Sequence, residues 1–159
     1  SVSRESGHMR KCTNDDCAIE HFPRLDPAVI MLVHDGGDRL ILGRNKNWQV
    51  GQHSVLAGFV ESGESLEDSV AREIYEEAGV TVTDIHYHSS QPWPFPSSIM
   101  LGFTARATAL TLNVNREELE DAAWFTRDDL LNSPEDNSFR LPRKDSISRR
   151  LIEDWMKVD

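Results

Sequence analysis

A cluster of glutamates inside one short segment constrains this chain more than any other feature. Glu73, Glu76 and Glu77 lie in the stretch from Gly58 to Val80. In an α-helix, residues three and four positions apart lie on one face, so the three carboxylates would share an arc of roughly 100°. Like charges at this spacing repel one another on a bare helix. Divalent cations that prefer oxygen ligands would offset that repulsion, and we therefore interpret the helix as a metal platform.

The residues around this cluster indicate where the helix begins and ends. Ser65 can act as the N-cap, because its hydroxyl can accept a backbone hydrogen bond from the first turn. Gly79 occupies the C′ position, where glycine takes the left-handed conformation without strain. The sequence therefore predicts a helix over residues 66–78. Four apolar residues on a neighbouring arc can anchor it to a core: Val70, Ala71, Ile74 and Ala78.

A solvated acidic helix face is the alternative interpretation of such a cluster. The bracketing glycines argue against it, because the whole segment resembles the Nudix box. The matching positions are Gly58, Glu64, Arg72, Glu73, Ile74, Glu76, Glu77, Gly79 and Val80. The resemblance implies the Nudix fold, an α+β (α/β/α) fold with a mixed β-sheet sandwiched between helices. It also implies two or three Mg²⁺ or Mn²⁺ ions, held by the helix glutamates. We expect Arg72 to pair with the carboxylates of the box and Glu64 to support the loop before the helix.

The composition fits one globular domain with a sizeable core, since the chain has 159 residues. Apolar runs stay well short of the ~20 residues that cross a membrane, so we expect a cytoplasmic protein with no membrane partner. The formal net charge of −10 disfavours unaided binding of polyanions. Phosphate-rich ligands would need metal ions as an intermediary. Basic residues gather near the C-terminus and could either contact phosphate or form a solvated segment: Arg140, Arg143, Lys144, Arg149 and Arg150.

Hydrophobic patterning predicts strands on both sides of the glutamate helix. The apolar run at residues 28–34 is typical of a strand buried on both faces, and Asp35-Gly36-Gly37-Asp38 predicts a hairpin turn after it. Val82, Ile85 and Tyr87 are expected to point inward from a strand over 80–90. Further strands are expected at 39–43, 54–57, 99–112 and 122–126, with a proline-rich break at 92–96 and helices at 128–131 and 146–156.

A second motif, Ser90 to Ser98, follows the box with the sequence SQPWPFPSS. Its alternating prolines fix φ and stiffen the loop, so Trp93 and Phe95 would be held rigidly and could stack on a ring of a ligand. A turn whose aromatics cap the core is the alternative. The combination of this motif with the box resembles the NADH pyrophosphatase branch of the Nudix superfamily. Residues 22–32, 54–65 and 118–125 extend the resemblance, which covers about residues 12–156.

That branch hydrolyses the pyrophosphate bond of NADH or NAD⁺ to NMN(H) and AMP, and some members also remove the NAD cap from RNA 5′ ends. The resemblance implies a dinucleotide substrate, NAD-capped RNA as a second one, and a homodimer. It implies metal ligation and catalysis by Glu73, Glu76, Glu77 and Glu118, with Glu77 favoured for proton abstraction from the attacking water or for holding the metal that binds this water. Glu120 and Asp121 remain open as alternatives to Glu118. The implied substrate contacts are Phe22, Phe59, Trp93, Ser98, Met100 and Ser148.

The start of the chain suggests a boundary before the catalytic domain. The RESGHM sequence of residues 4–9 is typical of cloning vectors, so we interpret residues 1–8 as an expression-tag remnant. Residues 9–24 resemble the second half of a zinc ribbon and a connector, and residues 25–159 the Nudix catalytic domain. Cys12 and Cys17 are the only cysteines and provide half of a zinc site, so Zn²⁺ is expected only with further upstream ligands.

Two other functions stay open at this stage. One is a Nudix hydrolase for another nucleoside diphosphate derivative such as ADP-ribose. The other is a non-catalytic, nucleotide-binding Nudix module, but such modules usually have broken carboxylates in the box, whereas all four glutamates are present here.

Overall fold

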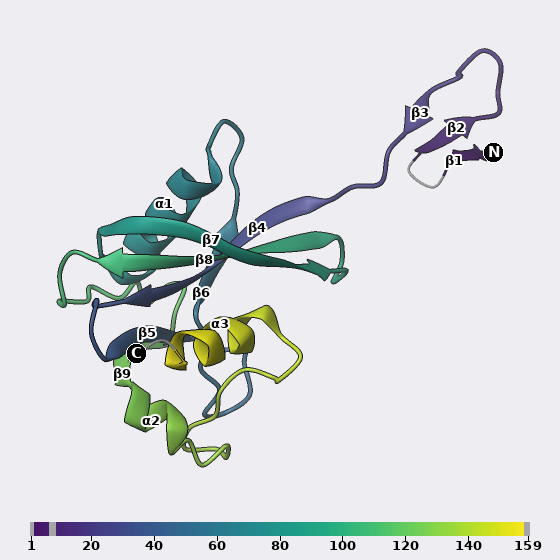
Figure 1. Cartoon of the computed structure of the whole chain (residues 1–159). Helices are drawn as coiled ribbons and strands as arrows, with labels where there is room; N and C mark the ends of the chain where they lie inside the picture. The colour runs from purple at the N-terminus through teal and green to yellow at the C-terminus, as the bar shows by residue number, and fades with distance from the viewer. Residues whose placement is uncertain (1, 7–8, 158–159) are drawn as a thin grey trace.

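Figure 1 shows the fold of the chain in a computed structural model, which describes residues 2–6 and 9–157. Residues 1, 7 and 8 of the expected tag lie outside the described residues. The elements are β1 (Val2–Ser6), β2 (Met9–Cys12), β3 (Glu20–His21), β4 (Asp26–His34), β5 (Arg39–Arg44), β6 (Leu56–Phe59), α1 (Leu66–Ala78), β7 (Val82–Trp93), β8 (Ser98–Ala107), β9 (Asp121–Thr126), α2 (Arg127–Leu131) and α3 (Ile147–Met156).

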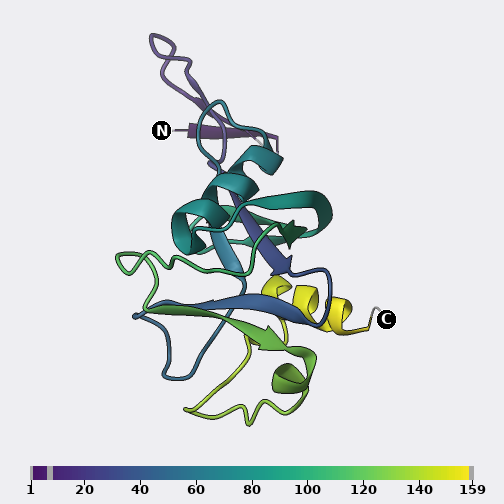
Figure 2. The same cartoon turned by 90° about the vertical axis from the view of Figure 1, so that its left-hand side faces the viewer.

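A six-stranded mixed sheet forms the main body. Its strand order is β7-β8-β4-β5-β9, and β6 also pairs with β4. β4 and β8 are parallel, whereas the other pairs of this sheet are antiparallel. Figure 2 shows α1 and α3 separated by the sheet. The expected α+β fold, with a mixed sheet sandwiched between helices, is therefore confirmed.

β4 lies at the centre of this sandwich because both of its faces are apolar. Val29 and Met31 point into the core beneath α1, where they meet Val70 and Ile74. Ile30 and Leu32 belong to the core on the opposite face, together with Leu151 and Ile152 of α3. Successive side chains of a strand point to opposite faces, so one continuous apolar run serves both cores, as the sequence predicts.

Several strand boundaries differ from the expectations. The strand expected at 54–57 is β6 at 56–59, and the one expected at 99–112 ends at Ala107. β7 continues through Pro92 to Trp93, although the prolines predict a break. A proline is tolerated there because β7 is an edge strand, where a backbone N–H can be absent from one side.

The expectation that Tyr87 points inward is wrong. Val82 and Ile85 do pack against the core beneath α1, but the Tyr87 side chain is exposed. The pairing of β7 with β8 shifts register between Thr83 and His86 and again between Tyr87 and Ser89. Each extra residue in a strand changes the face on which later side chains lie, and periodicity alone does not reveal such shifts.

A separate three-stranded sheet, β1-β2-β3, precedes the main body. Residues 22–25 connect it to β4, and Figure 1 shows it extending away from the larger sheet. The hairpin between β2 and β3 carries both cysteines. No helix among the described residues has the length and apolar character needed to cross a membrane.

Candidate active site

The glutamate helix α1 is fixed firmly against the sheet. Its N-cap Ser65 accepts a hydrogen bond from the backbone N–H of Asp68, whose carboxylate reaches back to the Ser65 N–H, and Gly79 ends the helix with φ 68°. Val70, Ile74 and Ala78 are fully buried. The caps agree with the boundaries predicted from the sequence and fix the two ends of the helix. The buried apolar face fixes the rotation of the helix about its axis, and with it the direction of the glutamates.

Two of the three helix glutamates are buried. Glu73 and Glu77 are 9% and 8% exposed, whereas the Glu76 side chain is half exposed. Glu73 lies against the backbone at Gly58 of β6, so closely that a Cβ built on Gly58 would be 1.8 Å from the Glu73 carboxyl carbon. A glycine is therefore required at position 58 for Glu73 to occupy this place.

Arg72 binds the carboxylates around the start of the helix. Its Nη1 donates to Glu73 Oε1 at 2.8 Å and to Glu76 Oε2 at 3.0 Å, and its Nη2 donates to Glu64 Oε2 at 2.9 Å. Glu64 also accepts from the Ser69 hydroxyl and the Glu61 N–H. These bonds, with that from Arg72 the strongest, lower the pKa of Glu64 to about 2. Glu64 thus links the loop before α1 to the helix.

Glu77 has no such partner. Its pKa is raised to about 8, chiefly by burial and in smaller part by the nearby charges of Glu73, Glu118 and Glu76. Among the described residues, Glu77 Oε2 is a buried side-chain oxygen that has no hydrogen-bond partner. A buried, unsatisfied carboxylate is costly, and perturbed groups of this kind mark candidate functional sites.

These residues fit a hard divalent cation, since every donor is a carboxylate oxygen and one buried oxygen lacks a partner. Within the described ranges, however, no three His, Cys, Asp or Glu side chains form a group already arranged to hold a metal ion. Arg72 forms ion pairs with both Glu73 and Glu76. Cation binding would therefore require these two carboxylates to exchange the arginine for the ion.

Glu118 approaches the helix glutamates from the loop between β8 and β9. The loop is fixed to the end of α1, because Asn113 N–H donates to Ala78 O and Asn115 N–H donates to Glu77 O. Burial is the main cause of the raised pKa of Glu73 and of Glu77, and the charge of Glu118 adds a smaller contribution to both. The two alternatives are engaged elsewhere: Glu120 pairs with Arg44 at 2.9 Å, and Asp121 pairs with Arg116 at 3.2 Å. Glu118, whose carboxylate accepts a hydrogen bond from the Asn115 side chain at 3.2 Å, is the member of this acidic run whose charge acts on the helix glutamates. Its role as a metal ligand stays a prediction.

A cavity of about 370 Å³ adjoins the glutamates. Glu77 lines it together with three of the residues expected to bind substrate: Trp93, Met100 and Ser148. Ser148 is buried at the start of α3, and its hydroxyl lies 2.7 Å from that of Ser54. The cavity therefore brings the predicted carboxylate site next to the strand end of the second motif and the first turn of α3.

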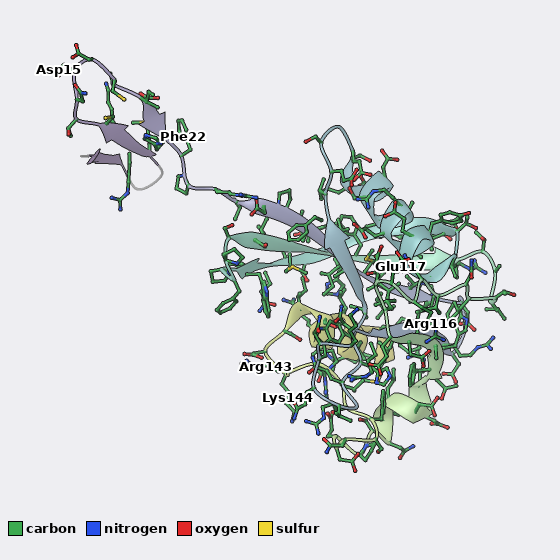
Figure 3. All side chains as sticks on the ribbon, turned by 180° about the vertical axis from the view of Figure 1, so that it is seen from behind. Asp15, Phe22, Arg116, Glu117, Arg143 and Lys144 are labelled. Atoms are coloured by element: carbon green, nitrogen blue, oxygen red, sulfur yellow. The ribbon has the colours of Figure 1, made fainter. Side chains whose placement is uncertain are left out.

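Three expected substrate contacts do not line this cavity. Phe59 is exposed at the end of β6, where its carbonyl accepts a hydrogen bond from Arg72. Ser98 is buried and pairs in register with Trp93. Phe22 lies on the connector, away from the main body in Figure 3. The roles predicted for these three residues stay predictions.

The loop between β5 and β6 contributes residues that the sequence analysis did not select. These are Asn45, Trp48 and Gln52, which line the cavity. Arg143, one of the basic residues that could contact phosphate, lines it from the segment before α3. In the sequence, Trp48 is marked only by its aromatic ring within a mostly polar loop, which is a weak indication of a binding residue. Their convergence follows from backbone pairing between Gln52 and Arg140, a contact between segments far apart in the sequence.

Cys12 and Cys17 are free thiols at the two sides of the β2–β3 hairpin. A hydrogen bond from the backbone of Ile19 lowers the pKa of Cys17, and a weaker contribution comes from Cys12. Two thiolates cannot complete a structural zinc site, which takes four ligands. No third ligand joins them among the described residues, so the zinc site stays a prediction that depends on further ligands.

The raised pKa of Glu77 predicts a pH-dependent stability of the metal-free protein. The folded state binds more protons than the unfolded state between the ordinary pKa of 4.5 and about 8, so stability is greatest below this interval and falls as pH rises through it. The slope should approach about 1.4 kcal/mol per pH unit. Urea unfolding at several pH values with a chelator present should show this slope. Glu77→Gln should flatten the slope. Glu67→Gln changes an exposed position of the same helix and should retain it.

A family model and known proteins match most of this chain. A model of the NUDIX domain family matches residues 24–147. NAD-capped RNA hydrolase NUDT12 from Macaca fascicularis is 41% identical over 165 residues, which cover 98% of this chain and 36% of that protein. NAD-capped RNA hydrolase NudC from Mycobacterium bovis (strain BCG / Pasteur 1173P2) is 49% identical over 145 residues, covering 86% and 46% of the respective chains. The chain thus spans less than half the length of these relatives.

Solved structures share the fold at lower sequence identity. A NUDIX hydrolase from Nitrosomonas europaea has a TM-score of 0.75 and 19% identity, and the match covers 99% of this chain and 85% of that one. MutT structures from Aliivibrio salmonicida and Vibrio cholerae include a match with a TM-score of 0.63 and 22% identity, covering 82% and 99%. Similarity at these identities supports the arrangement of the sheet and helices and no more.

Proposed function

Because this chain belongs to the NUDIX domain family, we propose that it is a metal-dependent hydrolase of the pyrophosphate bond of NADH or NAD⁺, giving NMN(H) and AMP. By the same cleavage it would remove the NAD cap from RNA 5′ ends. The observation that carries the proposal is the buried, unpartnered oxygen of Glu77 at the wall of a cavity that Trp93 also lines. The names of the two relatives described above support the choice of an NAD-derived substrate.

In the proposed mechanism, the carboxylates and the cavity have separate tasks. Mg²⁺ or Mn²⁺ held by Glu73, Glu76, Glu77 and Glu118 would neutralise phosphate charge and lower the pKa of the attacking water. We assign acceptance of the water proton to Glu77 Oε2, because this oxygen is buried without a hydrogen-bond partner and Glu77 lines the cavity. Arg72 and Glu64 position the glutamates rather than contact substrate.

The cavity would hold one nucleoside half of the substrate. Its volume of about 370 Å³ lies near the lower end for small-molecule sites, so the remaining half would lie across its mouth. Trp93 offers a ring for stacking, and Met100 and Ser148 form part of the wall. We further propose a homodimer in a cytoplasmic setting. Phe22 lies on the connector, away from the main body in Figure 3, and a second copy of the chain could bring it to a substrate; light scattering of the purified protein would test this assembly.

Parallel turnover of NADH, NAD⁺, ADP-ribose and NAD-capped RNA would test the proposed function. With Mg²⁺ or Mn²⁺ present, we expect AMP from NADH and uncapped 5′-monophosphate RNA from the capped substrate. Addition of a chelator should abolish both reactions. A preparation that binds NADH tightly and releases no AMP would instead favour the non-catalytic alternative, and faster cleavage of ADP-ribose would favour the other hydrolase.

Removing the Trp93 ring should weaken substrate binding more than it slows the chemistry. Base stacking on an aromatic side chain contributes roughly 1–3 kcal/mol, so Trp93→Ala should raise KM for NADH about tenfold with a smaller change in kcat. Tyr75→Ala is the control, because Tyr75 is an aromatic residue that is 61% exposed and does not line the cavity, whereas the ring of Phe95 contacts that of Trp93. An equal rise in KM for both variants would contradict the assignment to Trp93.

A further inference from the structure

Two lysines beside the cavity carry charges that the protein itself does not neutralise. Most arginines of the main body pair with carboxylates, as Arg44 does with Glu120 and Arg149 does with Glu135. Lys46 and Lys144 are exposed and make no hydrogen bond or ion pair within the described part of the chain. On a chain with a net charge of −10, unpaired cations next to a candidate substrate cavity call for an explanation.

Both lysines lie on loops that form the rim of the cavity. Lys46 stands between Asn45 and Trp48, which line the cavity, and Lys144 follows Arg143, which also lines it. Hydrogen bonds join the two loops, since Arg140 N–H donates to Gly51 O at 2.9 Å and His53 N–H donates to Arg140 O at 3.0 Å. Figure 3 shows Arg143 and Lys144 together at the edge of the main body, pointing outward.

Arg143 differs from its neighbour in how its charge is used. Its Nη2 and Nε donate to the two carboxylate oxygens of Asp145 at 2.7 and 3.0 Å, so this pair is internally neutral. The lysine ammonium groups remain available to an anion from solution. A phosphate ester fits them, because a lysine binds phosphate as a point charge without the planar geometry that arginine requires.

We propose that Lys46 and Lys144 form a subsite for a phosphate carried on the adenosine ribose, outside the pyrophosphate that is cleaved. The inference rests on the proposed function, which supplies a substrate with an adenosine ribose. Two substrates carry such a phosphate: NAD-capped RNA, as the phosphodiester to the next nucleotide, and NADPH, as a phosphomonoester. Because the basic rim is small, it would contact only the first one or two phosphates beyond the cap.

The test compares kcat/KM of the wild type and the Lys46→Gln/Lys144→Gln variant for NADH, NADPH and an NAD-capped oligonucleotide. A contact to a single-strand phosphate contributes about −0.7 to the slope of log affinity against log salt. The variant should therefore lose about tenfold in kcat/KM for the capped oligonucleotide at low salt, and its salt slope should become less negative by about 1. NADH turnover should change less than about twofold, since NADH lacks the additional phosphate.

A charge-matched control separates a local subsite from a general field. Arg10→Gln/Arg106→Gln removes two charges from exposed positions that do not line the cavity, and it should leave the preference for capped RNA unchanged. Loss of the preference in this control, or equal losses for NADH and capped RNA in the lysine variant, would overturn the subsite. A selective loss with NADPH alone would overturn the phosphodiester as its ligand and identify the monoester.

Failure of the subsite and failure of the proposed function give different results. If neither NADH nor capped RNA is cleaved by the wild type, the proposed function is rejected. The lysines are then judged by fluorescence anisotropy with a labelled NAD-capped oligonucleotide. A dissociation constant that is the same for wild type and lysine variant would reject the subsite as well, and a roughly tenfold weaker one would support it.

Discussion

Replacing Glu77 with Gln should lower kcat for NADH hydrolysis by about 10²–10⁴-fold, the range that a positioned general base contributes. The change keeps the size of the side chain and removes the carboxylate that is buried beside the cavity without a partner. Since no hydrogen bond of the fold is lost, the variant should stay folded. Quantifying AMP release under saturating Mg²⁺ and NADH would measure the effect.

The stability of the same variant provides an independent check. Ionisation of a buried carboxylate opposes folding, so Glu77→Gln should be more stable than the wild type near pH 8 when metal is absent, while being far less active. Glu67→Gln is the control, because Glu67 lies on the exposed part of the first turn and should retain nearly full activity. A Glu77→Gln variant with wild-type kcat would exclude Glu77 from the chemistry.

Gly58→Ala should abolish most of the activity while leaving the fold largely intact. The added methyl group would overlap the Glu73 carboxylate, whose carbon lies 1.8 Å from the position of the new Cβ. The Glu73 side chain can move away because only its end is affected, but it then leaves the place from which it would bind a cation. We expect a loss in kcat/KM on the order of 10²-fold, since small displacements of positioned groups have effects of that size, together with weaker dependence on Mn²⁺.

Gly37→Ala is the matched control for this change. A Cβ at Gly37 would meet only Asp35, at an ordinary contact distance of 3.4 Å, in the turn between β4 and β5. Circular dichroism and thermal unfolding should show both variants folded, and activity should separate them. Full activity of Gly58→Ala would mean that Glu73 is not required where the structure has it.

The sequence predicted those parts of the fold that depend on local chemistry. The helix at 66–78 agrees with the observed α1 because Ser65 and Gly79 supply a cap at each end. The buried strand at 28–34 could also be predicted, because a strand that contributes side chains to a core on each face has a continuous apolar run. Neither prediction required knowledge of any contact distant in sequence.

Features that depend on distant contacts could not be predicted in this way. The exposure of Tyr87 follows from register shifts against β8, and the place of Trp48 at the cavity follows from pairing of its loop with residues near Arg140. For the carboxylates, spacing predicted the cluster, whereas the raised pKa of Glu77 required its depth of burial. The effect of the Glu118 charge on Glu77, and the ion pair between Glu120 and Arg44, likewise depend on the folded arrangement.

The alternation along β4 has a mechanical consequence for the enzyme. Val29 and Met31 support the glutamate helix, and Ile30, between them, forms part of the cavity wall. The carboxylate helix and part of the wall of the proposed substrate cavity therefore both rest on β4, on side chains that are adjacent in the sequence. A disturbance of this strand would shift both at once, so mutations here should impair affinity and turnover together.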